Sequence, residues 1–282
     1  MTIEEHSQVP GTQEQSIKIA VIVPTFNRPD YLIDGIKSVM AQTYPHWLLI
    51  ISNDCSTVDY SDAEPWLNDV RIHYIVREVN GGCNAARNTG IDAAIQLGAD
   101  YVAFMDDEEQ LDPHCLEQAI EAIKLNPGIG WFVSNTTGES KPSTRQIIED
   151  RVYDWVDDYM YGKALRGDKM HVISVCTLGD IRFDGRYRAS NMWPFFLALA
   201  NKTKIYGYKY PSKRIQYLET GITKTTSRYP RTWLELTSRF AKHAYAIQIR
   251  PAKLQAYKYL FLELAKSPKR VIVLLKKRFS QS

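Results

Sequence analysis

The sequence predicts an α/β fold with a doubly wound, mostly parallel sheet flanked by helices. Apolar runs typical of buried strands alternate with amphipathic helical stretches over residues 17–134, as in parallel strands joined by crossover helices. Polar residues follow several of these runs where the strands should end. The chain has 282 residues, 44% hydrophobic and 24% charged, which is enough for a large α/β domain with an ample core.

The first half of the chain has the clearest succession of elements. Residues 17–24 form a β-branched run that ends at a proline, as expected of a buried parallel strand. Pro29 suits the first turn of a helix with Leu32 and Ile36 in its apolar stripe. Asn84 can cap the next helix, which follows two glycines and runs to about residue 97. Further strands are expected at 47–52, 70–76, 100–105 and 129–133, and a helix is expected from Asp112-Pro113.

The second half is less regular. Its first stretch, residues 135–163, is polar and aromatic. Strands are then expected at 170–178, 204–210 and 215–218, with a helix from Trp193. We expect this half to close over the sheet edge and to form the pocket of a second substrate. The predicted organisation is a disordered tail over 1–16, a domain over 17–225 that divides after 134, and basic C-terminal helices over 226–282.

Charge and cysteine usage exclude several classes of function. The net charge of +3 is too weak to indicate a nucleic-acid partner. The polar N-terminus lacks the apolar core of a signal peptide, and no run approaches the ~18 apolar residues of a membrane span. The protein is therefore expected in the cytoplasm, either free or at the inner face of the plasma membrane. Free thiols, with no zinc-binding spacing, are expected for Cys55, Cys83, Cys115 and Cys176.

Four consecutive acidic residues, Asp106 to Glu109, end the fourth predicted strand. An open α/β sheet places its ligands at the C-terminal edge of its strands. Adjacent carboxylates repel one another unless a cation lies among them, and their oxygens suit Mg²⁺ or Mn²⁺ that also binds substrate phosphate. A solvated acidic turn is the alternative. A functional site is favoured because Thr25, Asn27 and Asp54 follow neighbouring strands and should reach the same edge.

Four short motifs occur in order between residues 17 and 115. They are Val21-Ile-Val-Pro-Thr-Phe-Asn-Arg28, Asn53-Asp54-Cys55-Ser56, Asn80-Gly-Gly-Cys-Asn-Ala-Ala-Arg87-Asn88-Thr-Gly90 and Phe104-Met-Asp-Asp-Glu-Glu109. Together they resemble the family 2 glycosyltransferases of the GT-A fold, although each motif alone is weak. The resemblance implies a Rossmann-like GT-A domain over 17–225, in which 17–134 binds the nucleotide sugar and 135–225 binds the acceptor. The resemblance becomes weaker after residue 135.

The resemblance also implies which residues bind the nucleotide. In that family the loop after the first strand and the Asp after the second strand hold the base. The Gly-rich turn and the Arg of the following helix also contact the nucleotide. The corresponding residues of this sequence are Pro24, Thr25, Asn27, Asp54, Gly82 and Arg87. The structural alternatives are a plain turn for Gly82 and a surface ion pair for Arg87.

The acidic motif of the family is usually Asp-x-Asp, and its counterparts here are Asp106 and Glu108. The resemblance implies that both bind Mn²⁺ or Mg²⁺, which would act as a Lewis acid on the leaving diphosphate. Asp107 would lie near the ribose. Glu109 would either support the metal ligands or be solvated.

The acceptor side departs from the family pattern. The segment over residues 181–197 resembles one that usually ends in Glu-Asp just before a Trp, where one carboxylate is the general base. Here the two positions are Asn191 and Met192, and neither accepts a proton at neutral pH. An inverting displacement needs a base near the incoming hydroxyl. Asp180, Asp158 and Glu219 are candidate substitutes, with Asn191 at the expected catalytic position.

The leading hypothesis is a metal-dependent, inverting glycosyltransferase of the hexosyltransferase type. It would transfer a sugar from a nucleotide diphosphate sugar to a hydroxyl of a cell-surface polysaccharide or lipid-linked glycan. The alternative is a nucleotide-sugar-binding protein of the same fold that has lost its base. A nucleotidyltransferase is disfavoured, because it would need a Gly-rich, Lys- or Arg-bearing loop where this chain has residues 24–28.

The last stretch of the chain, residues 268–279, has five apolar residues between clusters of Lys and Arg. A basic amphipathic helix of this kind can lie on anionic lipid, which would give a peripheral membrane contact. The alternative is an ordinary C-terminal helix whose cations interact with its dipole and with solvent.

Overall fold

The computed structural model describes residues 16–139, 144–188, 192–216, 233–249, 251 and 253–279. Within the C-terminal helices, the side chains of residues 233–236, 239 and 269–279 lie outside this description. The tail predicted over residues 1–16 also lies outside it, apart from Ser16.

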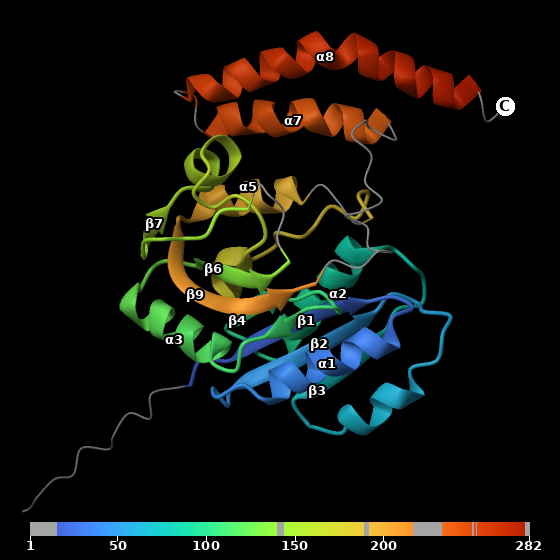
Figure 1. The fold of residues 1–282 in the computed structure, drawn as a ribbon, viewed down its shortest axis with the longest axis vertical. Helices are drawn as coiled ribbons and strands as arrows, with labels where there is room; N and C mark the ends of the chain where they lie inside the picture. The colour runs from blue at the N-terminus through green and yellow to red at the C-terminus, as the bar shows by residue number, and fades with distance from the viewer. Residues whose placement is uncertain are drawn as a thin grey trace, which may run out of the picture.

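A nine-stranded mixed sheet forms the centre of the molecule (Figure 1). Its order is β3-β2-β1-β4-β8-β6-β9-β5, and β7 pairs with β9. Strands β1 to β4 are parallel, as the alternation of strands and helices predicts, whereas β8 is antiparallel to both neighbours. The strands are β1 (Ile19–Thr25), β2 (Trp47–Asn53), β3 (Ile72–Val76), β4 (Tyr101–Phe104), β5 (Gln110–Leu111), β6 (Trp131–Gly138), β7 (Arg151–Tyr153), β8 (Met170–Ser174) and β9 (Ile205–Ile215).

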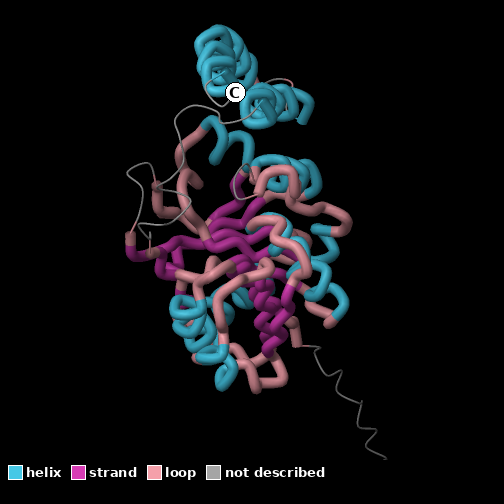
Figure 2. Tube along the Cα trace, turned by 90° about the vertical axis from the view of Figure 1, so that its right-hand side faces the viewer, coloured by secondary structure: helices cyan, strands magenta, loops and turns pink. Residues whose placement is uncertain are grey.

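Helices cover both faces of the sheet and bury a separate apolar core on each (Figures 1 and 2). Within β1, Ile19 and Val21 face the core shared with α1 and α3, whereas Ala20 and Ile22 face the core shared with α2 and α5. The continuous apolar run is therefore what a strand buried on both faces requires. The helices are α1 (Pro29–Met40), η1 (Ser61–Trp66), α2 (Cys83–Gln96), α3 (Cys115–Leu125), η2 (Trp155–Tyr161), α4 (Val175–Leu178) and α5 (Trp193–Lys202).

The register between β4 and β8 determines which loops meet at the edge of the sheet. These strands are antiparallel, with Tyr101 opposite Ser174 and Ala103 opposite Val172. The residues that precede β8 therefore lie beside the residues that follow β4. The segment that follows β8 starts at the opposite edge, next to the beginning of β4. As a result, the chain just before Met170 approaches the acidic cluster.

Two predictions for the second half are wrong in detail. The strand expected over 170–178 ends at Ser174, where its pairing with β4 and β6 stops, and the last four residues form α4. The strands expected at 204–210 and 215–218 are one strand, β9, as far as Ile215. Register shifts in its pairing with β6 around Asn135 allow β9 to continue past Pro211. Residues 217 and 218 lie outside the described part of the chain.

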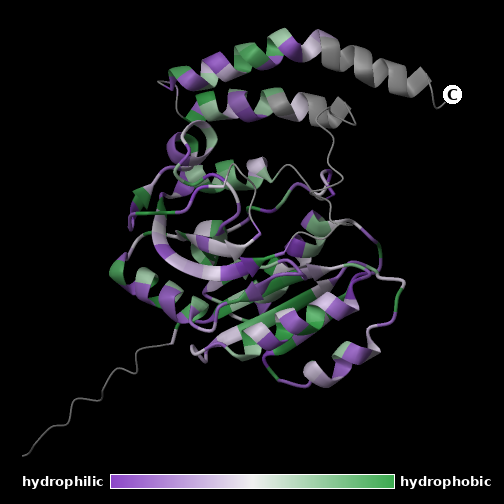
Figure 3. Cartoon of the chain, viewed as in Figure 1, coloured by the Kyte–Doolittle hydropathy of each residue, from purple (hydrophilic) through white to green (hydrophobic). Residues whose placement is uncertain are grey.

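Two long helices, α7 (Trp233–Ile249) and α8 (Leu254–Phe279), form the predicted C-terminal extension (Figure 1). Helix α7 packs on α5, and α8 packs along α7. Trp193 Nε1 donates to Ser238 Oγ at 2.7 Å, and Tyr161 Oη lies 2.8 Å from His243 Nδ1, so polar contacts join α7 to the rest of the molecule. Apolar and polar residues are interspersed along the coloured parts of both helices (Figure 3). None of the described helices has the length and apolarity to cross a membrane.

Candidate active site

Hydrogen bonds and ion pairs connect the loop after β1 with the acidic cluster after β4. Pro24 and Thr25 end β1 in buried positions, and Thr25 Oγ1 donates to Asp107 Oδ2 at 2.9 Å. Arg28 Nη1 lies 3.2 Å from Asp107 Oδ1 and 2.9 Å from Glu108 Oε2. The structure thus brings together two of the segments that were expected at one edge of the sheet.

The four acidic side chains have different surroundings. Asp106 Oδ1 lies 2.5 Å from Arg87 Nη2 on α2, and Glu109 Oε2 lies 2.5 Å from Lys213 Nζ on β9. The side chain of Asp106 is 44% exposed, whereas those of the other three acids are between 6% and 17% exposed. Asp106 is therefore the acid of the cluster that is most open to a ligand.

The cluster has more carboxylates than cations. Burial raises the pKa of Glu108 to about 9, and its hydrogen bond with Asp107 and the charges of Asp106 and Asp107 act in the same direction. Burial also opposes ionisation of Asp106, but the positive charges of Arg87 and Lys213 outweigh it and lower the pKa. Three basic side chains contact four acids, and this shortage of cations disfavours the charged form of Glu108.

The carboxylate of Asp54 holds the glycine turn that precedes α2. Its oxygens accept hydrogen bonds from the backbone N–H groups of Gly81 at 3.0 Å and Gly82 at 2.6 Å, and Arg77 forms an ion pair with it. Gly82 has a φ of +86°, and a Cβ there would lie 2.4 Å from the carbonyl oxygen of Arg188. Glycine is therefore required at this position. The contacts of Asp54 show that it positions the turn at the start of α2.

Two asparagines connect loops around the same edge. Asn27 is exposed, has a φ of +57°, and accepts a hydrogen bond from the backbone N–H of Thr57 at 2.8 Å. The cap expected from Asn84 is not formed, because Gly82 is the N-cap residue of α2. The Asn84 side chain is buried instead, and its Nδ2 donates to the carbonyl oxygen of Tyr187 at 2.6 Å. This bond ties α2 to the segment that leads toward α5.

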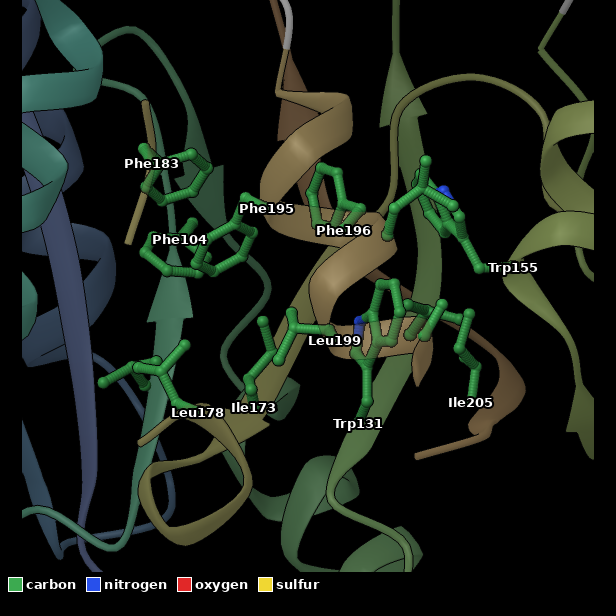
Figure 4. Packing of buried hydrophobic residues seen from close by; sticks show 14 of the residues in the cluster. Phe104, Trp131, Trp155, Ile173, Leu178, Phe183, Phe195, Phe196, Leu199 and Ile205 are labelled. Atoms are coloured by element: carbon green, nitrogen blue, oxygen red, sulfur yellow. The ribbon is translucent and has the colours of Figure 1, made fainter. Parts of the chain in front are cut away.

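A cavity of about 120 Å³ opens beside Asp106. The rings of Trp155 and Tyr159 stack at its wall with centroids 3.9 Å apart. Trp155 also stacks with Phe196, at 4.6 Å, and Figure 4 shows these two rings beside each other. Aromatic faces beside charged groups suit a ligand with apolar and polar surfaces, such as a sugar. The lining residues are Arg87, Phe104, Asp106, Glu109, Trp155, Tyr159, Gly167, Asp168, Lys169, His171, Phe183, Met192, Phe196 and Lys213.

The presence of several residues at this site could not be inferred from the sequence pattern. Lys213 pairs with an acid 104 residues away, and no spacing in the sequence indicates this contact. Asp168 and His171 reach the cavity only because β8 is antiparallel to β4, whereas the sequence predicts a mostly parallel sheet. Arg28 contacts Asp107 and Glu108. It lies in the loop after the first strand, and this position at the sheet edge is the feature of the sequence from which the contacts could have been inferred.

Of the candidate bases considered from the sequence, the two that fall within the described residues do not line this cavity. Asp180 is exposed in the segment that follows β8, which starts at the opposite edge of the sheet. Asp158 accepts a hydrogen bond from the backbone N–H of Asp154 at 2.8 Å and pairs with Arg151 at 3.4 Å, so it stabilises the start of η2. Asn191 and Glu219 lie outside the described residues.

The residues present fit a divalent cation that shares its ligands with a substrate. Within the described part of the chain, no group of three or more His, Cys, Asp or Glu is arranged to hold a metal ion. Asp106 and Glu108 nevertheless offer carboxylate oxygens in a cluster with excess negative charge. Mg²⁺ is commonly held by one or two carboxylates together with substrate phosphates.

Residues 20–184 match the family model of glycosyl transferase family 2. The chain belongs to this family. The match spans β1 to β8 and therefore includes the acidic cluster, the glycine turn and Asp168 of this family 2 chain. Helix α5, strand β9 with Lys213 and the two C-terminal helices follow the matched region.

Relatives whose names state an activity match parts of this family 2 chain. It is 37% identical over 105 residues to TuaG of Bacillus subtilis (strain 168), whose name assigns it to teichuronic acid biosynthesis; the match covers 36% of this chain and 40% of TuaG. It is 33% identical over 121 residues to a Campylobacter jejuni GalNAc(5)-diNAcBac-PP-undecaprenol beta-1,3-glucosyltransferase, with 42% and 38% covered. The chain thus spans well under half the length of these relatives.

A solved structure with the same fold covers more of the chain. Residues 1–349 of S. aureus TarS, in complex with UDP-GlcNAc, superpose with a TM-score of 0.70 at 16% identity. The superposition covers 88% of this chain and 72% of that one. This likeness confirms the GT-A fold that was expected from the sequence.

Proposed function

We propose that this family 2 chain is a metal-dependent glycosyltransferase that uses a nucleotide diphosphate sugar. The position of Asp106 carries the proposal. It pairs with Arg87, which belongs to the helix that follows the glycine turn, and its exposed oxygens border a cavity with aromatic walls. A carboxylate in this position can hold a cation between a donor diphosphate on one side and an acceptor on the other.

The residues around Asp106 divide the tasks of binding and orienting the donor. Asp106 and Glu108 would hold Mn²⁺ or Mg²⁺, which supplies Lewis-acid stabilisation of the leaving diphosphate. Arg87 would contribute a positive charge beside the diphosphate. The Asp54-supported turn at Gly82 would bring the N-terminal end of α2 close to the nucleotide.

The remaining nucleotide contacts would come from the loop after β1. Pro24, Thr25 and Asn27 would surround the base with Asp54. Asp107 would face the ribose, with its carboxylate held by Thr25 and Arg28. These assignments follow the order of the motifs along the edge of the sheet.

The acceptor would enter from the aromatic side of the cavity. We expect its hydroxyl to attack the anomeric carbon directly, with inversion of configuration, and to displace the nucleoside diphosphate. The names of the relatives favour a cell-surface polysaccharide or a lipid-linked glycan as the acceptor. Transfer at such an acceptor would take place at the inner face of the plasma membrane.

Donor use can be tested with a thermal-shift screen of UDP-, GDP-, dTDP- and CMP-sugars in Mn²⁺, followed by hydrolysis and transfer assays on the donors that bind. We expect Glu108→Ala to lose turnover by about 10²-fold or more, since even the loss of a group that only supports a metal ligand costs about 10- to 100-fold. Glu121→Ala changes an exposed acid on α3 and serves as the control. Full wild-type turnover in EDTA, or an unimpaired Glu108→Ala variant, would reject the metal assignment.

A nucleotide-sugar-binding protein without catalysis is the second candidate. It is favoured by the residues at the expected base positions, since Asn191 and Met192 cannot accept a proton. Met192 moreover lines the cavity. Binding of a nucleotide sugar without hydrolysis or transfer across a broad acceptor panel would support this candidate and reject the enzyme.

We also propose that α8 attaches the protein to an anionic membrane surface. Leu254, Tyr257, Phe261 and Leu264 are exposed and recur every three or four residues, so they form one stripe along the helix. Ala256 is fully buried and lies on the opposite face, toward α7. The apolar stripe is therefore left on the outer side of the helical pair.

Charge favours a lipid surface over a second copy of the chain as the partner of this stripe. Helix α8 contains seven Lys or Arg residues and one acidic residue, Glu263. This charge attracts anionic headgroups and repels an identical helix. In the sequence, Ile272 and Leu275 continue the same spacing, within the basic stretch 268–279.

A further inference from the structure

The carboxylate of Glu109 closes the turn that carries the proposed metal ligands. Its Oε2 accepts a hydrogen bond from the backbone N–H of Asp106 at 2.9 Å. The backbone N–H of Glu109 in turn donates to the carbonyl oxygen of Asp106 at 3.0 Å. Glu108 lies between the two bonded residues. One buried side chain therefore helps to fix the backbone from which Asp106 and Glu108 project.

Lys213 holds the same carboxylate oxygen from β9. Its Nζ donates to Glu109 Oε2 at 2.5 Å, and both side chains are buried. Lys213 is opposite Leu111, which lies two residues after Glu109, and long side chains reach such a diagonal neighbour across an antiparallel pair. On its other side, β9 pairs with β6, where Lys213 is opposite Thr136. The lysine thus acts from a backbone that is held between two strands.

Two possible roles of this ion pair would have opposite effects on a bound cation. Lys213 lines the same cavity as Asp106 and Glu109. If Lys213 acted only through its charge, it would repel a cation, and its removal would tighten metal binding. If it acts through Glu109 on the backbone of Asp106, its removal would loosen the ligands and weaken metal binding. Metal affinity therefore distinguishes the two roles.

We propose that Glu109, held by Lys213, is a positioning residue that sets the affinity of the acidic cluster for Mn²⁺ or Mg²⁺. The inference rests on the metal assignment of Asp106 and Glu108 in the proposed function. Both hydrogen bonds to the Glu109 carboxylate end on the same oxygen, Oε2, and one of them comes from the backbone of a ligand residue. Groups that orient metal ligands in this way commonly change metal affinity or activity by about 10- to 100-fold when they are removed.

The test replaces both members of the pair by apolar side chains, in the double variant Glu109→Met and Lys213→Met. The two opposite charges disappear together, so the net charge of the cluster is unchanged. Replacement of a buried ion pair by apolar groups of similar size is often neutral or stabilising, so this variant should fold. We expect it to bind Mn²⁺ about 10- to 100-fold more weakly than the wild type, because the N–H of Asp106 loses its acceptor.

Mn²⁺ is titrated into each protein with and without UDP or GDP, and the electron paramagnetic resonance signal of the free ion gives the fraction bound. The same nucleotides without protein serve as the blank. The control is the double variant Asp69→Asn and Arg71→Met, which removes an ion pair of 2.6 Å. This pair lies just before β3 and therefore at the opposite edge of the parallel strands. The control should bind Mn²⁺ as the wild type does.

Lys213→Met alone tests the direction of the effect. The buried Glu109 carboxylate then lacks its cation and should leave the position in which it holds Asp106. We expect Mn²⁺ to bind about 10-fold more weakly, although the cluster has become more negative. Lys213→Arg keeps the positive charge and should bind Mn²⁺ as the wild type does. Where circular dichroism shows that Lys213→Met is unfolded, the double variant decides.

The outcomes separate this inference from the proposed function. Wild-type Mn²⁺ affinity in the Met double variant, or unchanged or tighter binding by a folded Lys213→Met, would overturn the positioning role. A wild type that leaves the free Mn²⁺ signal at the level of the blank, under every condition, would reject the metal assignment itself.

Discussion

Lys213 Nζ lies 2.5 Å from Glu109 Oε2, and the two side chains are only 9% and 7% exposed. The ion pair joins β9 to the acidic cluster, so it connects the last strand of the sheet with the loop after β4. Burial removes both groups from water, and each charge is stabilised mainly by the other. The acidic cluster therefore depends on a residue beyond the segment that matches the family model.

Replacement of Lys213 should destabilise the protein. Lys213→Met leaves Glu109 buried without its cation, which typically costs about 3–5 kcal/mol in the free energy of unfolding. Urea unfolding would measure the loss, and Lys209→Met, an exposed position on the same strand, is the control. The double variant with Glu109→Gln should recover much of the stability. Equal stabilities for Lys213→Met and Lys209→Met would show that the acidic cluster does not depend on Lys213.

The glycine turn should tolerate no side chain at residue 82. In Gly82→Ala the new Cβ would meet the Arg188 carbonyl oxygen at 2.4 Å, in addition to the strain of a positive φ. Gly98→Ala is a matched control, because Gly98 also has a positive φ, of +69°, but its Cβ would have nothing within 4 Å. We expect Gly98→Ala to cost about 1–2 kcal/mol of stability and Gly82→Ala to cost more and to weaken nucleotide-sugar binding. Similar binding by the two variants, measured by calorimetry, would contradict this role of the turn.

Stability should fall in mild acid because of His243. Burial and the charge of Lys242 lower the pKa of His243 to about 4, whereas its ordinary value is 6.5. The unfolded chain therefore binds this proton more readily than the folded chain does. The stabilisation is present above pH 6.5 and is lost as the pH falls toward 4, by about 2 kcal/mol between pH 7 and pH 5. His243→Gln should flatten this dependence in urea unfolding, and identical slopes for both proteins would disprove it.

The exposed stripe of α8 should control membrane binding. We expect the wild type to sediment with phosphatidylcholine vesicles that contain phosphatidylglycerol, and to remain free with phosphatidylcholine alone. The double variant Phe261→Ser and Leu264→Ser should bind at least about 10-fold more weakly, because two apolar side chains no longer enter the lipid. The control pair Val70→Ser and Val79→Ser changes exposed apolar residues elsewhere. A concentration-dependent dimer that the stripe variant abolishes would instead identify a second copy as the partner.

The parallel half of the sheet could be predicted from sequence because its signals are local. A strand buried on both faces needs a continuous apolar run, and residues 17–24 supply one. The acidic cluster could be placed at the sheet edge for the same reason, since Asp106 directly follows such a run. Because β1 and β4 are parallel neighbours, their ends lie at the same edge of the sheet, and this brings Thr25 close to Asp107.

The side of the cavity that we propose for the acceptor could not be predicted, because its contacts depend on pairing between distant strands. Nothing in residues 170–174 indicates that they insert between β4 and β6 in the antiparallel sense. That insertion brings Asp168 to the cavity and leaves Asp180 at the opposite edge. The long course of β9 depends likewise on a bulged register with β6. The positions of Asp168 and Lys213 are therefore consequences of the tertiary structure.

The antiparallel pairing between β6 and β8 fixes both ends of the chain segment that forms the aromatic side of the cavity. Trp131 pairs with Ile173 and Ser134 with Met170, so one antiparallel pair fixes both ends of the intervening chain, and β7 within it pairs with β9. The intervening chain carries Trp155, Tyr159 and Asp168, which form much of that wall. A contiguous segment anchored at both ends can be exchanged for one of different composition without changing the pairing of β1 to β4, provided that β6 and β7 keep their pairing with β9. Grafting this segment between relatives would therefore show whether this wall selects the acceptor, as we propose.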